Sequence, residues 1–107
     1  MITPDEALLV LGKWREEKTP LHAVVRFDGF DFGFDCRVIV CSLESIGLDL
    51  AGEWDVCQIS LSGFRFDYSA PNDLESVKVR ERIYPSGLRG FGPRGEVLWL
   101  MEIAREV

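Results

Sequence analysis

This sequence of 107 residues has little of what usually identifies an enzyme or a membrane protein. It has one histidine, His22, so no second imidazole is present for a zinc site, and any histidine-dependent proton transfer would have to use this residue. No apolar run approaches the roughly 20 residues that cross a bilayer. Residues 1–6 show no basic region ahead of an apolar one, as a signal peptide would. We therefore expect a cytoplasmic protein that binds no membrane.

Cysteine is also rare, and its count of three is odd. No two cysteines have the Cys-x-x-Cys spacing. Cys36 and Cys41 lie five positions apart in an expected strand, which directs their side chains to opposite faces and keeps them from pairing. We expect Cys36, Cys41 and Cys57 to act as small buried hydrophobic side chains.

Motifs for binding phosphate or metal are missing as well. Residues 85–95 are rich in Gly and Pro, but they lack Gly-Lys-Ser/Thr and no clear helix follows them. This segment is therefore predicted to be a mobile hairpin tip. Asp28, Asp31 and Asp35 do not have the order of a calcium-binding loop. We expect no metal, no cofactor and no enzymatic activity.

What the chain does contain is apolar: 47% of its residues are hydrophobic and 11% are aromatic, which is ordinary for a compact core. A chain of this length forms one domain, residues 1–107, and needs no disulfide or metal to fold. Thr3, Pro4 and Glu6 have the pattern of a capped helix start. The apolar residues that follow recur at helical spacing, namely Ala7, Leu8, Leu11 and Trp14. A helix over 4–18 that packs on a sheet is predicted.

The segment from residue 30 to residue 41 is the clearest strand. Apolar residues occupy every second position, namely Phe30, Phe32, Phe34, Cys36, Val38 and Val40. Side chains of a strand alternate between its two faces, so we expect this set to be buried and the residues between them to be solvated. From Val38 on, Ile39 and Cys41 make the second face apolar too, which predicts cover on both sides of that end.

The rest of the chain predicts a β-rich region over 21–103. Asp28-Gly29 is a strong signal for a hairpin turn. The segment 97–103 fits both strand and helix spacing. We favour a strand, because it would pair with a sheet edge that is otherwise exposed.

One helix followed by about six short, bent strands predicts an α+β fold, mainly antiparallel, whose N-terminal helix caps a small barrel or half-open roll. The layout resembles the SH3-like barrels, in particular the Sm-like group, whose members begin with a helix and stack into rings. Pro93-Arg94-Gly95-Glu96-Val97 is similar to the family's closing segment, and Asp28-Gly29 to its first hairpin turn. The family's RNA-binding Asp and Asn have no counterpart in residues 42–45. The resemblance implies ring assembly, and this departure puts RNA binding in doubt.

The net charge of −6 conceals a basic segment. Residues 1–77 carry six Lys and Arg against fourteen Asp and Glu, a balance of −8, whereas residues 78–94 carry five against one, a balance of +4. Residues 77–83 are expected to form one strand with its three basic residues on one face. Together with residues of the Gly-rich segment they are the candidate binding residues: Lys78, Arg80, Arg82, Arg89, Phe91 and Arg94.

Three explanations of these basic residues remain open at this point. They protect an edge strand against aggregation. Alternatively, they meet the acidic surface of residues 1–77, within the chain or in a neighbouring subunit, which implies self-association or an acidic protein partner. In the third explanation they bind an anion, and Phe91 stacks on a nucleic-acid base.

His22 is expected on the strand face opposite Leu21 and Ala23, as a solvated or hydrogen-bonded side chain. A hydrolase or transferase built on His22 would need a pocket that also holds a carboxylate and a nucleophile. We therefore expect a non-enzymatic binding or self-assembly module that forms a homo-oligomer. The alternative is a nucleic-acid-binding Sm-like module that uses residues 78–94.

Overall fold

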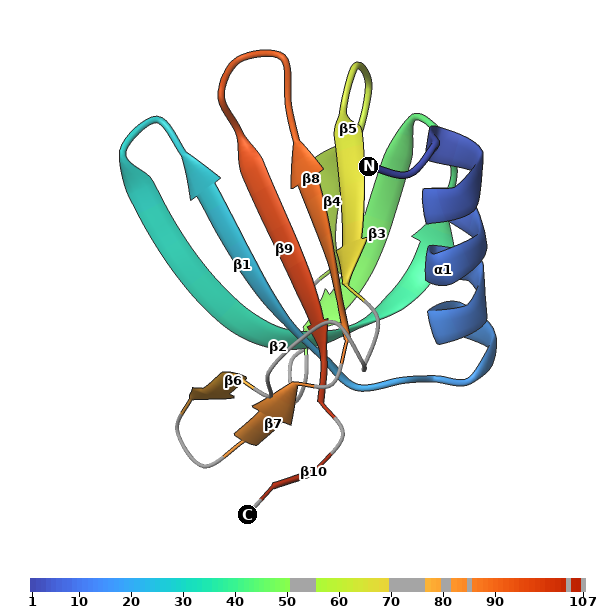
Figure 1. The fold of residues 1–107 in the computed structure, drawn as a ribbon, viewed down its shortest axis with the longest axis vertical. Coiled ribbons are helices and arrows are strands. Elements are labelled where there is room, and N and C mark those ends of the chain that lie inside the picture. The colour runs from blue at the N-terminus through green and yellow to red at the C-terminus, as the bar shows by residue number, and fades with distance from the viewer. Residues whose placement is uncertain (51–55, 70–76, 80–81, 85, 104, 107) are drawn as a thin grey trace.

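The structure, a computed structural model, describes residues 1–50, 56–69, 77–79, 82–84, 86–103 and 105–106 (Figure 1). The elements of this part are α1 (Pro4–Glu16), β1 (Leu21–Phe27), β2 (Phe30–Cys41), β3 (Ser45–Leu50), β4 (Val56–Ser60), β5 (Arg65–Ser69), β6 (Val77–Val79), β7 (Arg82–Tyr84), β8 (Gly87–Phe91), β9 (Val97–Glu102) and β10 (Arg105–Glu106). Seven strands form the main sheet in the order β4-β3-β2-β1-β9-β8-β5, and a small sheet has the order β10-β7-β6.

The main sheet is antiparallel and strongly curved, and α1 packs against β2 and β5 on one side of it (Figure 1). This arrangement confirms the expected α+β class, with an N-terminal helix and a mainly antiparallel sheet. The outer strands of the main sheet are β4 and β5, and in the described part of the chain they do not pair with each other. The sheet is therefore an open, curled one and is not closed into a barrel.

The start of α1 follows the predicted capping pattern. The Thr3 hydroxyl accepts a hydrogen bond from the Glu6 backbone N–H at 3.2 Å, and the Glu6 carboxylate accepts one from the Thr3 backbone N–H at 3.1 Å. The helix ends at Glu16, two residues earlier than predicted. It ends there because the chain turns at residues 17 and 18, where Lys18 adopts a left-handed backbone conformation (φ 52°).

Strand β2 connects the two parts of the main sheet. A two-residue turn joins it to β1, with positive φ at Asp28 (48°) and Gly29 (83°), as a type I′ turn requires. Residues 30–36 of β2 pair with β1, and residues 36–41 pair with β3. In Figure 1 the strand curves from the free end of the β1–β2 hairpin to the side of α1.

The core lies between α1 and the inner face of the main sheet. Its buried residues are Ala7, Leu11, Trp14, Leu21, Ala23, Cys36, Val38, Ile46, Leu48, Leu61, Phe64, Phe66, Leu88, Leu98 and Leu100. Helical spacing in α1 and alternation in β2 therefore place Ala7, Leu11 and Trp14 in one cluster with Cys36 and Val38.

The predicted burial of β2 is wrong at both ends of the strand. Phe30 and Phe32 are exposed, because they belong to the part of β2 that extends beyond α1 (Figure 1). Ile39 and Val40 are exposed too, so this end is not covered on both sides. The register between β2 and β3 shifts between Val38 and Val40, which ends the simple alternation there.

The Gly-rich segment 85–95 is not a mobile tip throughout. Residues 87–91 form β8, which is paired with β5 on one side and β9 on the other. Glycine allows this close packing, since a Cβ at Gly90 would lie 2.9 Å from Phe64 Cδ2. Residues 97–102 of the segment 97–103 form the strand β9, which confirms the preference for a strand over a helix.

The single strand expected over 77–83 is also wrong. Val77–Val79 and Arg82–Tyr84 are two antiparallel strands, β6 and β7, with Lys78 opposite Ile83. Lys78 and Arg82 consequently belong to two different strands. Arg80 lies outside the described residues.

Candidate functional site

The six predicted binding residues fall in separate places. Lys78 and Arg82 belong to β6 and β7 of the small sheet, whereas Arg89 and Phe91 belong to β8 of the main sheet. Arg94 follows in the β8–β9 loop. In Figure 1 the small sheet lies at one end of the main sheet, and the β8–β9 loop lies at the other. The structure therefore brings Arg89 and Phe91 together and separates Arg94 from the small sheet.

Arg89 lies between two aromatic rings. Its guanidinium carbon is 5.7 Å from the ring centroid of Phe91 and 5.3 Å from that of Trp99, which is opposite Arg89 in the β8–β9 pair. Gly87 leaves room for the indole, since a Cβ there would lie 3.1 Å from Trp99 Nε1. Trp99 is not among the residues predicted for this site, because only the pairing of β8 with β9 places it beside Arg89.

His22 lies opposite Asp35 in the β1–β2 pair, and its Nδ1 is 2.9 Å from Asp35 Oδ1. Leu21 and Ala23, its neighbours in β1, are buried in the core, so the expected direction of the His22 side chain is confirmed. A Cβ at Gly33 would lie 3.0 Å from His22 Nε2, and the imidazole therefore packs directly on the backbone of β2. This geometry is that of a hydrogen-bonded strand histidine.

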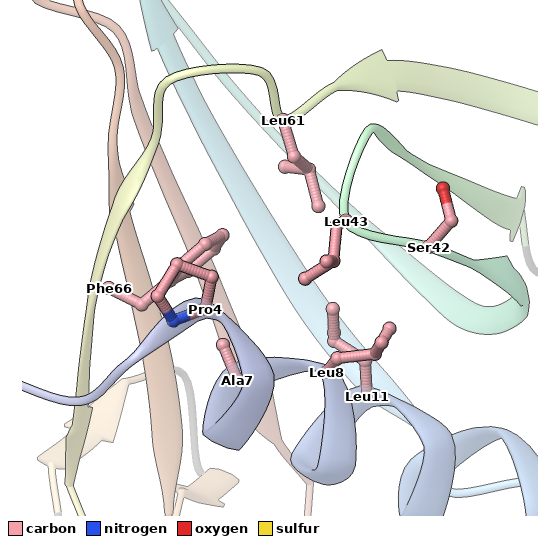
Figure 2. A pocket seen from close by; sticks show the side chains of 8 residues that line it. All are labelled: Pro4, Ala7, Leu8, Leu11, Ser42, Leu43, Leu61 and Phe66. Carbon is pink, nitrogen blue, oxygen red and sulfur yellow. The ribbon is translucent and has the colours of Figure 1, made fainter.

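A small cleft separates the first half of α1 from the turns after β2 and β4 (Figure 2). It is lined by Pro4, Ala7, Leu8, Leu11, Ser42, Leu43, Leu61 and Phe66. The Ser42 hydroxyl is the one side-chain polar group of this lining, and it accepts hydrogen bonds from the backbone N–H groups of Glu44 and Ser45. The cleft has about 190 Å³ including space open to solvent, less than the ~300 Å³ of a typical ligand pocket.

The three cysteines are free thiols. Cys36 is buried as predicted, whereas Cys41 and Cys57 are only partly buried. Burial raises the pKa of the Cys36 thiol to about 12, and the neighbouring charge of Asp35 adds to the effect. This thiol is therefore protonated at neutral pH and unsuited to act as a nucleophile. Among the described residues, no group of three or more His, Cys, Asp or Glu is arranged to bind a metal ion.

The free end of the β1–β2 hairpin carries an aromatic surface. Its exposed members are Phe27, Phe30 and Phe32, with 48%, 70% and 52% of their surface accessible. Phe34 continues the row toward the core, and its ring stacks on that of Phe32 with the centroids 6.1 Å apart. We call Phe27, Phe30, Phe32 and Phe34 the aromatic hairpin surface.

The opposite face of the same hairpin is polar and internally paired. Arg26 Nε donates a hydrogen bond to Asp31 Oδ1 at 2.7 Å, and this bond raises the pKa of the Arg26 guanidinium above its already high value. Asp35 is bonded to His22 further along. The hairpin therefore has one apolar face and one face whose charges are compensated.

The aromatic hairpin surface was not found from the sequence. Alternation correctly placed its residues on the same face as Cys36 and Val38, but it does not show where along a strand the core ends. The available signal was the Asp28-Gly29 turn, because residues beside a hairpin turn lie at the end of a sheet.

Comparison of the chain with protein-family models, with curated proteins and with solved structures finds no significant match. The described part of the chain also contains no helix that is both long and apolar enough to cross a bilayer.

Proposed function

We propose that the protein is a non-enzymatic protein-binding module, and that the aromatic hairpin surface is its contact site. The observation that carries the proposal is the exposure of three phenylalanines side by side, with 70% of Phe30, 52% of Phe32 and 48% of Phe27 accessible. Single exposed apolar residues are common, whereas contiguous apolar patches mark interaction sites.

The chemistry of the surface agrees with this role. Aromatic side chains bury about 150–250 Å² each and lose little conformational entropy when they are fixed, so they dominate the energetics of interfaces. The stack of Phe32 on Phe34 fixes two of the rings before any partner arrives. The salt bridge between Arg26 and Asp31 lies on the other face of the hairpin and can stay solvated when the aromatic face is covered.

The proposal is tested by selecting binding peptides from a displayed random library on the wild-type protein. The double variant Phe30→Ser/Phe32→Ser is expected to bind the selected peptides at least about ten-fold more weakly than the wild type, since it removes two rings of the surface. The matched control is Leu9→Ser/Val56→Ser, which removes two other exposed apolar side chains, 74% and 55% accessible. Its affinity should equal that of the wild type. If the two double variants bind alike, the aromatic hairpin surface is not the contact site.

A second candidate function is the binding of single-stranded nucleic acid. It is favoured by the contact of Arg89 with the rings of Phe91 and Trp99, which we call the Arg89 stack. An arginine beside the partly buried rings of Phe91 and Trp99 provides both a charge for phosphate and rings for base stacking. Lys78 and Arg82 belong to the small sheet and not to β8 or β9, and for this reason we rank nucleic acid second.

This candidate predicts that the affinity for a single-stranded oligonucleotide falls steeply with salt, because phosphate contacts release counterions. Arg89→Ala should weaken binding about ten-fold, whereas Arg15→Ala, which removes an exposed arginine of α1, should not. An affinity that is unchanged by Arg89→Ala argues against the Arg89 stack as a nucleic-acid site.

A further inference from the structure

We infer that the partner bound by the aromatic hairpin surface is a second copy of this chain, and that the two copies join by antiparallel pairing of their β2 strands. The inference rests on the proposed function and adds the partner and the geometry of contact. In the described part of the chain, residues 30–34 of β2 pair with β1 and with no other strand. In Figure 1 this part of β2 forms the edge of the sheet on the side away from α1.

The turn determines which backbone groups this edge presents. In a hairpin with a two-residue turn, the flanking pair exchanges hydrogen bonds, and here that pair is Phe27 and Phe30. Hydrogen-bonded and non-bonded pairs alternate along an antiparallel ladder. The N–H and C=O groups of Asp31 and Gly33 therefore point away from β1, and no described residue bonds to them. An edge with unpaired groups is a template for another strand.

Charge distinguishes three neighbouring registers for the pairing of two such edges. If Asp31 were opposite Asp31 of the second copy, two carboxylates would face each other. If Gly33 were opposite Gly33, Asp31 would face Asp35 of the second copy. Like charges directly opposite destabilise a strand pair. In the register between these two, Asp31 is opposite Gly33 in both halves of the contact, and no carboxylates face each other.

The same register matches the aromatic rings. Phe32 is opposite Phe32 of the second copy, and each Phe30 is opposite Phe34. These are non-bonded pairs, in which the side chains of antiparallel strands come closest, and aromatic pairs across strands are favourable. The exposed parts of Phe27, Phe30 and Phe32 offer roughly 250–430 Å² per copy, from about 150–250 Å² for each side chain. The edge therefore pairs with itself through its backbone groups and its aromatic rings, without bringing two carboxylates opposite each other.

The size of the contact and the net charge predict how the dimer behaves. The contact is smaller than the ~1,600 Å² of a standard interface, so we expect a dimer whose population depends on concentration. Each copy carries a net charge of −6, and salt screens the repulsion between copies. The affinity of the dimer should therefore increase with salt. Self-association through the basic residues 78–94 and an acidic surface would instead become weaker as salt increases, because salt screens that attraction.

Sedimentation of the wild-type protein tests the partner, at about 0.01 M and about 1 M salt, where the Debye length is ~30 Å and ~3 Å. The expected result is a species of twice 12.1 kDa that becomes more populated with concentration and with salt, and that is lost in Phe32→Glu. A monomer at all concentrations up to about 1 mM overturns the second-copy inference. Selected peptides that require Phe30 and Phe32 would then still support the proposed function. A dimer that dissociates in salt or persists in Phe32→Glu also overturns the inference.

Cysteine cross-linking tests the register under oxidised glutathione. Phe32→Cys should form a disulfide-linked dimer with itself, because opposite residues of a non-bonded pair have Cα atoms about 4.5 Å apart. Phe30→Cys should not, since the two copies of residue 30 lie four positions apart along the pair, but it should cross-link to Phe34→Cys when the two variants are mixed. The wild type, with its three native cysteines, measures the background. Self-linking of Phe30→Cys without that of Phe32→Cys overturns the register.

Discussion

His22 and Asp35 face each other across the β1–β2 pair, with Nδ1 of the imidazole 2.9 Å from Oδ1 of the carboxylate. The pair lies at the base of the hairpin whose other end carries the exposed phenylalanines. The close approach of Gly33 to the imidazole adds a second constraint at the same place. The aromatic hairpin surface is thus supported by a polar contact on the opposite face of the same two strands.

We expect His22 and Asp35 to stabilise the fold jointly. A double-mutant cycle with His22→Ala and Asp35→Ala should give a coupling of about 0.5–1.5 kcal/mol in the free energy of unfolding, the usual net contribution of one hydrogen bond. Denaturant titration of the wild type, both single variants and the double variant measures it. Strict additivity of the two substitutions would show that the contact does not stabilise the protein.

Two glycines should respond in opposite ways to alanine. Gly90→Ala places a Cβ 2.9 Å from Phe64 Cδ2 in the core and should lower the free energy of unfolding by about 1–3 kcal/mol. Gly12 lies within α1 with open space around it, so Gly12→Ala should raise that energy by about 0.5–1 kcal/mol through helix propensity. Thermal unfolding of the two variants makes the comparison. Equal effects would contradict the tight packing of β8.

The capping box should contribute measurably to stability. Thr3→Ala removes the oxygen that accepts the Glu6 backbone N–H, and we expect a loss of about 1 kcal/mol in the free energy of unfolding. Thr3→Ser keeps that oxygen and serves as the control, with less than half of the loss. A Thr3→Ser variant as unstable as Thr3→Ala would assign the effect to packing of the Thr3 methyl group instead.

The raised pKa of Cys36 predicts a dependence of stability on alkaline pH. Its pKa is about 12 in the folded protein, against 9.0 as the ordinary value. Below pH 9 the thiol is protonated in both states and folding is unaffected. Between pH 9 and about 12 only the unfolded chain releases this proton, so the free energy of unfolding should fall as the pH rises. Cys36→Ala, measured by denaturant titration at pH 8, 9 and 10, should show a shallower fall, and an equal slope would contradict the prediction.

Much of the local structure could be predicted from short stretches of sequence. Thr3 and Glu6 specify the helix start, since both partners of the cap lie within one turn. Asp28-Gly29 specifies the hairpin, because the turn needs two residues that tolerate positive φ. In these cases the interacting groups are near neighbours in the chain, and the sequence pattern therefore contains them both.

The extent of the core and the candidate surfaces depended on contacts between distant segments. Phe32 and Val38 occupy the same face of β2, yet Phe32 is exposed and Val38 is buried. The reason is that α1 covers only the half of β2 that lies away from the β1–β2 turn (Figure 1). Trp99 meets Arg89 only through the pairing of β8 with β9.

The sequence by itself therefore determined the start of α1, the turn between β1 and β2 and which residues of a strand share a face, since these follow from local bonding and periodicity. The tertiary structure alone decided which part of each face is covered, because coverage depends on where distant elements pack and where they end.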